Sequence, residues 1–234
     1  MDETLTIGQL AERTGVQPGT LRMWESRHGF PRARRLPSGH RRYPGGEVER
    51  VLEVVHSREW GLVWDIGCNE GRHSRIAAEN ARYVVALDGD AAVVDRLYRA
   101  LAAEQATTIL PLVADVTDPS PALGWHGLER QTLDARGKPE LTLCLAVVHH
   151  VAISANVPVA EFLSWLAELG TALVIEFPTR DDPRVAALLQ RKKEGAHPDY
   201  DREPFERALA ERFEIIRSEE LSNGTRILYH AQPR

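Results

Sequence analysis

The chain is poor in cysteine and has no long hydrophobic run. Its 234 residues contain 2 cysteines, Cys68 and Cys144, and no residues with the spacing of zinc ligands. We therefore expect reduced, buried thiols, with neither a disulfide framework nor a metal site. The apolar runs are strand-sized, and no charged segment leads into an apolar stretch as in a signal peptide. The sequence predicts a cytoplasmic protein without membrane contact.

The sequence also has no linker rich in Pro, Gly or Ser. Charged residues are unevenly distributed between its two parts. Residues 1–60 hold 10 Lys and Arg against 8 Asp and Glu, whereas residues 61–234 hold 19 against 26. Five arginines fall between Arg32 and Arg42 with no acidic residue among them. This run favours a local anion-binding surface, and an ordinary solvated loop is the alternative. We place a domain boundary near residue 60, between a module of residues 1–60 and a domain of residues 61–234 packed against it or rigidly joined to it.

The first sixty residues have the pattern of two short helices across a tight turn. Thr6 and Gln9 are spaced as a capping box, which predicts a helix from Ile7 to Thr14. Gly15 ends this helix, and Pro18 starts a second that runs to about His28. The signatures Thr-Leu-Arg-x-Trp-Glu from residue 20 and Gly-His-Arg-x-Tyr from residue 39 follow in order. Together, residues 5–55 resemble the winged helix-turn-helix of the MerR family of transcription regulators.

The resemblance implies that the second helix enters the major groove of DNA while the wing contacts phosphates. It places two residues of that helix at bases or phosphates, Thr20 and Arg22. Five others would position the module on the DNA backbone: Trp24, Arg35, His40, Arg41 and Tyr43. MerR proteins dimerise through a long helix after the wing, but here only residues 47–60 are available for one. We therefore expect weak, salt-sensitive DNA binding by a single module.

A buried strand ending in a glycine turn opens the second domain. Residues 63–71 read Val-Trp-Asp-Ile-Gly-Cys-Asn-Glu-Gly. Gly67 and Gly71 let the chain bend tightly and let a nucleoside approach the backbone, and a helix from Gly71 to Asn80 follows. The pattern Asp65-x-Gly67-x-Asn69-x-Gly71 resembles the first motif of class I S-adenosylmethionine-dependent methyltransferases, with Asn69 where a glycine is common.

Two further strands are expected to end in carboxylates. Asp88 lies 21 residues after Gly67, the spacing at which an acidic residue accepts hydrogen bonds from ribose hydroxyls. It could instead only cap the next helix, Ala91 to Glu104. Asp115 ends the following strand, at the position that contacts adenine in class I methyltransferases. An NAD-binding fold is the lower-ranked alternative, because its fingerprint requires glycine among residues 68–70.

The methyltransferase resemblance implies S-adenosylmethionine as the cofactor. It assigns Asp65 to the methionine amino group and Asp88 to the ribose. The remaining assignments are Gly67, Cys68, Asn69 and Gly71 on the methionine and ribose side, and Asp115 and Val116 at the adenine.

The apolar run from Leu141 to Val151 is expected to form a long strand whose end carries His149 and His150. Either imidazole could act as a general base towards an acceptor hydroxyl or amine, or could simply pack there. Glu176, at the end of the next strand, is a second candidate for substrate contact. The motifs of nucleobase methyltransferases, Asp/Asn-Pro-Pro-Tyr/Phe and Pro-Cys, are missing. This disfavours DNA bases as acceptors.

Strands alternating with helices predict an α/β domain, and Asn223-Gly224 predicts a C-terminal antiparallel hairpin. The fold class expected is a Rossmann-like class I methyltransferase sheet with a small N-terminal winged helix-turn-helix. Residues 146–158 and the Ile-Glu-Phe strand also resemble methyltransferase domains related to nodulation proteins. The leading interpretation is methyl transfer from S-adenosylmethionine to an unidentified small-molecule acceptor. The alternatives are a DNA-binding regulator whose second domain senses a nucleoside or is inactive, and a fusion of two unrelated fragments.

Overall fold

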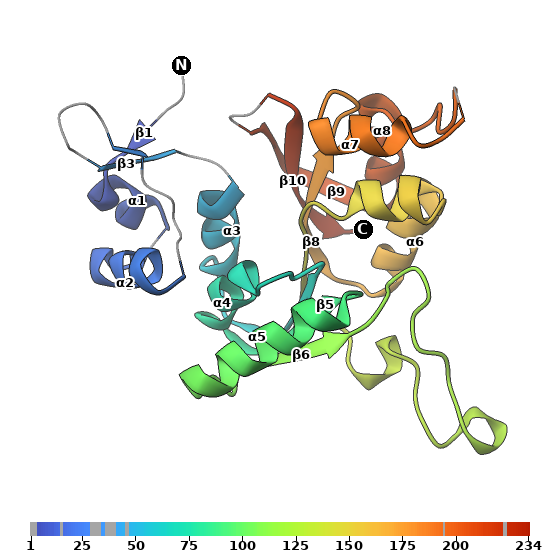
Figure 1. Ribbon diagram of the computed structural model, residues 1–234, viewed down its shortest axis with the longest axis horizontal. Coiled ribbons are helices and arrows are strands. Elements are labelled where there is room, and N and C mark those ends of the chain that lie inside the picture. The colour runs from blue at the N-terminus through green and yellow to red at the C-terminus, as the bar shows by residue number, and fades with distance from the viewer. Residues whose placement is uncertain are drawn as a thin grey trace.

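The computed structural model describes residues 4–14, 16–28, 34–35, 41–44, 47–193, 195–221 and 224–234. It consists of a small N-terminal head beside a seven-stranded sheet that is flanked by helices (Figure 1). No helix among these residues is long and apolar enough to cross a membrane.

The head contains two short α-helices, a three-stranded sheet and a third helix. Its elements are β1 (Thr4–Leu5), α1 (Ile7–Thr14), α2 (Pro18–His28), β2 (Arg34–Arg35), β3 (Arg41–Pro44) and α3 (Glu47–Val55). The predicted capping box is present, because Gln9 N–H donates to Thr6 Oγ1 (3.2 Å) and Thr6 N–H donates to Gln9 Oε1 (2.9 Å). Strand β3 pairs with both β1 and β2, so the backbone of the predicted wing is formed. Both predicted helices are confirmed.

Helix α3 ends at Val55, not at Trp60 as the sequence suggested. Side chains from outside the helix satisfy its C-terminal carbonyl groups. Trp60 Nε1–H donates to Val55 O (2.9 Å), and Asn80 Nδ2–H donates to Val55 O (3.2 Å) and Arg58 O (2.6 Å). These bonds stop the helix and let Trp60 begin the first strand of the large sheet.

The large sheet has the strand order β6-β5-β4-β7-β8-β10-β9. Five strands are parallel: β4 (Trp60–Ile66), β5 (Ala81–Asp88), β6 (Ile109–Val113), β7 (Leu141–Cys144) and β8 (Ala172–Pro178). The hairpin of β9 (Phe213–Glu220) and β10 (Arg226–Pro233) is antiparallel, as predicted. The chain runs outward from β4 to β6 and then resumes on the other side at β7. Ligands bind at such a switch point, outside the carboxyl ends of the strands.

Helices cover both faces of the sheet. Helices α4 (Arg72–Ala78) and α5 (Ala91–Glu104) belong to a core that also contains the buried residues of the head, such as Leu21 and Leu52. Helices α6 (Val159–Glu168) and α8 (Arg202–Arg212) build the core on the opposite face, and α7 (Pro183–Leu189) packs there through Val185. The head therefore shares a hydrophobic core with one face of the sheet. The domain boundary near residue 60 stays a prediction.

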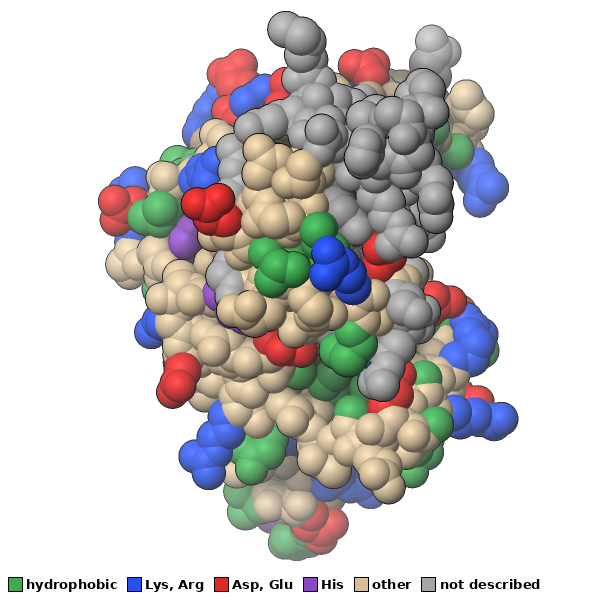
Figure 2. Space-filling view, turned by 90° about the vertical axis from the view of Figure 1, so that its left-hand side faces the viewer, with side chains coloured by type: hydrophobic (Ala, Val, Ile, Leu, Met, Phe, Trp, Pro, Cys, Tyr) green, Lys and Arg blue, Asp and Glu red, His purple; other side chains and the backbone are tan. Residues whose placement is uncertain are grey.

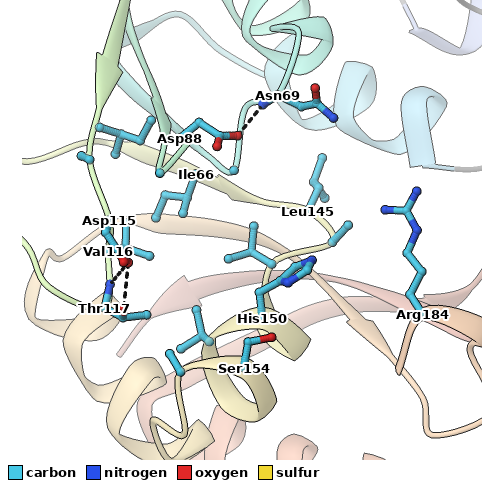
Figure 3. Close-up of a pocket in the computed structure, with 18 residues that line it drawn as sticks. Ile66, Asn69, Asp88, Asp115, Val116, Thr117, Leu145, His150, Ser154 and Arg184 are labelled. Atoms are coloured by element: carbon cyan, nitrogen blue, oxygen red, sulfur yellow. Dashed lines mark hydrogen bonds between the residues drawn. The ribbon is translucent and has the colours of Figure 1, made fainter. Parts of the chain in front are cut away.

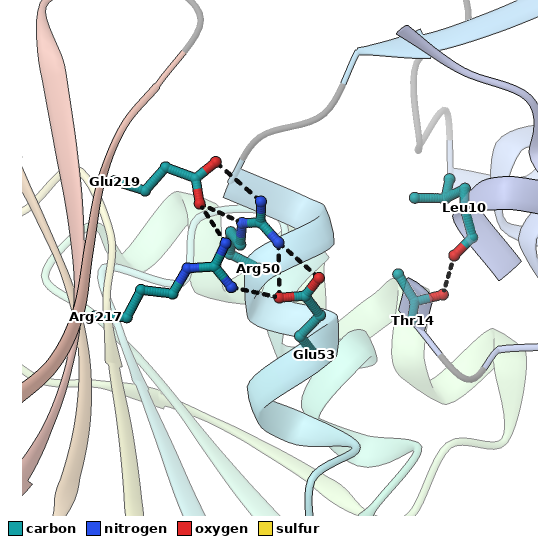
Figure 4. Close-up of polar contacts among 6 residues, drawn as sticks. All are labelled: Leu10, Thr14, Arg50, Glu53, Arg217 and Glu219. Atoms are coloured by element: carbon teal, nitrogen blue, oxygen red, sulfur yellow. Dashed lines mark hydrogen bonds and ion pairs between the residues drawn. The ribbon is translucent and has the colours of Figure 1, made fainter. Parts of the chain in front are cut away.

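A charged network joins the head to the edge of the sheet (Figure 4). Arg50 of α3 contacts Glu219 of β9 (Nε–Oε2 2.5 Å) and Glu53 on its own helix (Nη1–Oε1 2.6 Å). Arg217 of β9 contacts the same two carboxylates, at 3.3 Å from Glu53 and 3.1 Å from Glu219. Two carboxylates shared between two guanidinium groups fix the angle at which α3 meets β9.

Strand β7 is much shorter than expected. It ends at Cys144, and the histidines follow at a helical turn, where His149 directly precedes and His150 begins a short π-helix, η3 (His150–Ser154). The prediction of a strand reaching Val151 was wrong because a continuous apolar run does not distinguish a buried strand from a buried helix. Here the second half of the run packs as a helical turn against the core under α6.

The connection between β6 and β7 is long. It carries two short 3₁₀ turns, η1 (Trp125–Gly127) and η2 (Asp134–Arg136), and η1 lies away from the sheet in Figure 1. Trp125 is 76% exposed, so its side chain contributes to the surface rather than to a core.

Candidate functional site

The turn after β4 holds three residues in the left-handed region of backbone space. Gly67 has φ +72°, Asn69 has φ +48° and Gly71 has φ +70°. Glycine adopts this region without strain, and asparagine tolerates it better than most residues. This explains how Asn69 can stand where a glycine is common. Gly67 and Cys68 donate their N–H groups to Leu87 O (2.8 and 3.0 Å), which holds the turn against β5.

Asp88 at the end of β5 fixes the shape of this turn. Its Oδ2 accepts a hydrogen bond from Asn69 N–H (3.0 Å), and its Oδ1 accepts one from Asp90 N–H (2.9 Å). Asp90, rather than Asp88, caps α5 by accepting from Ala92 N–H (2.8 Å) and Val93 N–H (3.3 Å). The alternative role for Asp88 as a helix cap is therefore filled by its neighbour.

Asp115 follows the end of β6 by two residues and forms a local turn. Its Oδ1 accepts hydrogen bonds from Thr117 N–H (2.8 Å) and Thr117 Oγ1–H (2.7 Å). Figure 3 shows this pair at one end of a cavity, with Asp88 and Asn69 above the middle and Arg184 at the far end.

The cavity has a volume of about 450 Å³ and lies at the carboxyl ends of the parallel strands. Six predicted site residues line it: Gly67, Asn69, Asp88, Asp115, Val116 and His150. The lining residues that were not anticipated as contacts include Leu145, Ala146, Val147, Ser154 and Arg184. Ala146 has φ +56°, a strained value for alanine that is often found at functional sites.

Three predicted cofactor residues do not line the cavity: Asp65, Cys68 and Gly71. Asp65 is 1% exposed and accepts a hydrogen bond from Ser74 Oγ (2.5 Å), and burial raises the pKa of its carboxyl group. Cys68 is buried, which raises the pKa of its thiol, and Gly71 precedes the first turn of α4. Their positions suit a supporting role for the turn, and the predicted direct contacts stay untested.

The two histidines have different environments. His150 is exposed and lines the cavity, whereas His149 is fully buried and does not. Their ring centroids lie 4.2 Å apart. Burial, helped by the charges of His150 and Arg226, lowers the pKa of His149 to about 3. Burial and the nearby Arg184 lower the pKa of His150 below its usual value, so its ring is neutral at pH 7 and able to accept a proton.

Glu176 is not available as a substrate contact. Its side chain is fully buried, and Oε1 lies 2.6 Å from Nη1 of Arg226. The same guanidinium contacts Asp182 (Nε–Oδ2 2.6 Å). Burial alone would raise the pKa of Asp182, but the hydrogen bond and charge of Arg226, together with the backbone N–H groups of Arg184 and Val185, outweigh it and hold the pKa below its usual value. The expectation for Glu176 was wrong because β8 continues to Pro178, so Glu176 is not its last residue, and Arg226 of β10 pairs with the buried carboxylate.

Sequence comparisons identify relatives of both parts of the chain. Residues 6–43 match the model of the family described as "MerR family regulatory protein". Nodulation protein NoeA of Rhizobium meliloti (strain 1021) is 32% identical over 180 residues, which are 76% of this chain and 37% of NoeA. The transcriptional repressor CarA of Myxococcus xanthus is 46% identical over 53 residues, 22% of this chain and 18% of CarA. The chain thus spans well under half the length of these relatives.

Solved structures share the fold of the larger part. The N-methyltransferase NodS from Bradyrhizobium japonicum WM9 aligns with a TM-score of 0.56 at 13% identity, over 79% of this chain and 93% of NodS. The structure of NodS in complex with S-adenosylhomocysteine also aligns with a TM-score of 0.56, at 12% identity, over 79% of this chain and 84% of NodS. A SAM-dependent methyltransferase from Aquifex aeolicus aligns with a TM-score of 0.52 at 15% identity, over 81% of this chain and 90% of that protein. The predicted fold class is confirmed: a MerR-type helix-turn-helix precedes a class I methyltransferase fold.

Proposed function

We propose that this protein transfers a methyl group from S-adenosylmethionine to a small-molecule acceptor. The observation that carries the proposal is the cavity at the carboxyl ends of β4, β5 and β6, where Asn69, Asp88 and Asp115 meet. Its volume of about 450 Å³ lies in the range that holds a ligand of this size. Two carboxylates at successive strand ends and a turn with left-handed backbone suit a nucleoside bonded to an amino acid.

Each part of the cofactor has a residue that suits it. Asp88 would accept hydrogen bonds from the ribose hydroxyls, and Asp115 would accept one from the adenine amino group beside Val116. The backbone of Gly67 to Asn69 would lie along the methionine. When bound, S-adenosylmethionine supplies a methyl carbon attached to a positively charged sulfur, which retains the bonding electrons on transfer.

The chain's own contribution to transfer is positioning and proton removal. His150 lines the cavity with a neutral ring, so an imidazole nitrogen can take the proton that the acceptor loses as its nitrogen or oxygen bonds to the methyl carbon. Holding the acceptor in line with the methyl group supplies most of the rate. Because NodS is described as an N-methyltransferase, amines are the first class of acceptor to test.

Calorimetric titration with S-adenosylhomocysteine tests this proposal. We expect a dissociation constant in the micromolar range, equivalent to about −8 kcal/mol. NAD serves as the control ligand, because an NAD-binding site would reverse the order of affinities. Absence of S-adenosylhomocysteine binding by the folded wild-type protein, or tighter binding of NAD, would rule the proposal out.

A second function, weak DNA binding by the head, is favoured by the MerR match over residues 6–43. Arg22 is exposed on α2, and Thr20 is partly buried on the same helix. His40 lies outside the described residues, as do the side chains of Trp24, Arg35, Arg41 and Tyr43. Figure 2 shows acidic and basic side chains interspersed over the described part of the face that it presents. Such a mixed surface suits weak binding better than strong electrostatic steering.

Fluorescence anisotropy with a random DNA duplex at low salt tests the head. We expect binding that weakens steeply with salt, and the Arg22→Ala variant should lose about one unit of salt slope because one phosphate contact is gone. Arg99→Ala is the matched control, since Arg99 is an exposed arginine on α5, outside the head. Equal salt slopes for all three proteins would show that Arg22 does not contact DNA. If the protein binds S-adenosylhomocysteine and DNA but methylates no acceptor, the sensor alternative is supported.

A further inference from the structure

We propose that the methyl acceptor carries an anionic group, a carboxylate or a phosphate, which Arg184 binds at the end of the cavity beyond β7. This inference rests on the proposed function and names the substrate class for the same site. Three kinds of observation carry it: the order of the strand ends along the cavity, the partners of the nearby arginines, and the position of His150.

The strand order divides the cavity into two parts. The cofactor residues Asp115, Asp88 and Asn69 follow β6, β5 and β4, which are consecutive in the sheet. The next two strands are β7 and β8, and the segments after them contribute His150 and Arg184 to the cavity. Figure 3 shows Arg184 on the side of the cavity away from Asp115 and Thr117. The acceptor would therefore occupy the part of the cavity that is lined by the segments after β7 and β8.

Three arginines, Arg180 and Arg184 after β8 and Arg226 of β10, differ in their partners. Arg226 is held by Glu176 and Asp182, and Arg180 donates to the carbonyl oxygens of Tyr200 and His197. In the described part of the chain, the guanidinium of Arg184 has no ion-pair or hydrogen-bond partner, and its side chain is exposed and lines the cavity. A planar guanidinium with free donors matches carboxylate and phosphate oxygens in a bidentate arrangement.

The charges along the cavity are separated by sign. Its charged lining residues among those described are Asp88 and Asp115 at the cofactor part and Arg184 at the other end. His150 lies between them in Figure 3 and is close enough to Arg184 for that charge to lower its pKa. An acceptor whose nucleophile reaches His150 thus extends its other end towards an unpaired positive charge. A cationic end would be repelled by that charge, and a wholly apolar end would gain no attraction from it.

Thermal unfolding of the protein saturated with S-adenosylhomocysteine tests the inference with inorganic phosphate as the anion probe, at an ionic strength held constant with chloride. At ten times its dissociation constant, phosphate should raise the Tm of the wild type by about 3–6 °C. The Arg184→Gln variant should show no such rise and should keep its affinity for S-adenosylhomocysteine within about threefold. Arg191→Gln is the matched control, because Arg191 is exposed, close in sequence and absent from the cavity lining. It should respond like the wild type.

Acetate in a parallel series distinguishes the two anion classes, since a larger Tm rise with acetate assigns the subsite to carboxylates and a larger rise with phosphate to phosphates. The inference is overturned if neither anion stabilises the wild type, or if all three proteins respond equally. It is also overturned if Arg184→Gln weakens S-adenosylhomocysteine tenfold or more while leaving methylthioadenosine unaffected. That result would make Arg184 a partner of the cofactor's own carboxylate. Each of these outcomes leaves the proposed function intact, because that function fails if S-adenosylhomocysteine does not bind or if NAD binds more tightly.

Discussion

The Asp88→Ala variant is expected to bind S-adenosylhomocysteine about 100-fold more weakly than the wild type, measured by calorimetric titration. Asp88 lines the cavity, and its carboxylate is the proposed acceptor for the ribose hydroxyls. Hydrogen bonds to a charged group contribute about 1.5–3 kcal/mol each, and a loss of 2.7 kcal/mol is a factor of 100. The substitution also removes the acceptor that orients Asn69 N–H, so it loosens the turn beside the methionine.

Two further variants separate these effects. Asp88→Asn keeps one oxygen as an acceptor for a backbone N–H, so it should lose less affinity than Asp88→Ala. Asp95→Ala removes a carboxylate of α5 that is exposed and distant from the cavity lining, and it should bind like the wild type. If Asp88→Ala is folded and binds within about threefold of the wild type, Asp88 does not contact the ribose.

The features of the site that could be predicted from sequence are those set by local rules. Glycine at positions 67 and 71 and a carboxylate 21 residues after the first glycine follow from backbone geometry and strand spacing, and the structure brings Gly67 and Asp88 to one cavity. The capping box at Thr6 and Gln9 is equally local, since both bonds close within one helical turn.

The features that could not be predicted depend on distant contacts. The hydrogen bond from the Asn80 side chain to Val55 O helps to end α3. Asn80 lies 25 residues beyond Val55 in sequence, so no local pattern predicts this bond. His149 and His150 look equivalent on a strand end, but a helical turn buries one ring and exposes the other. Arg184 lies in a segment with several charged residues, and the sequence does not show which of its arginines are paired. In the structure Arg226 of β10 pairs with Glu176 and Asp182, so Asp182 is not the partner of Arg184.

The Gly67→Ala variant is expected to lose about 2–4 kcal/mol of unfolding free energy in chemical denaturation. Gly67 has φ +72°, and forcing alanine into that region costs about 1–2 kcal/mol. An added Cβ would also lie 2.4 Å from Cγ2 of Val147, and relieving such overpacking typically costs about 1–3 kcal/mol. Because Val147 lines the cavity, its displacement should weaken S-adenosylhomocysteine binding as well.

A double-mutant cycle with Val147→Ala separates strain from steric conflict. Val147→Ala alone should be destabilising, but in the Gly67→Ala background it removes the conflicting methyl group, so the two changes together should cost about 1–2 kcal/mol less than their sum. Gly89→Ala is the matched control: Gly89 also lines the cavity, is not held at positive φ, and has nothing within 4 Å of an added Cβ. It should change stability by less than about 1 kcal/mol. Strict additivity of Gly67→Ala and Val147→Ala would show that the backbone conformation alone, without the contact to Val147, requires glycine at the head of this turn.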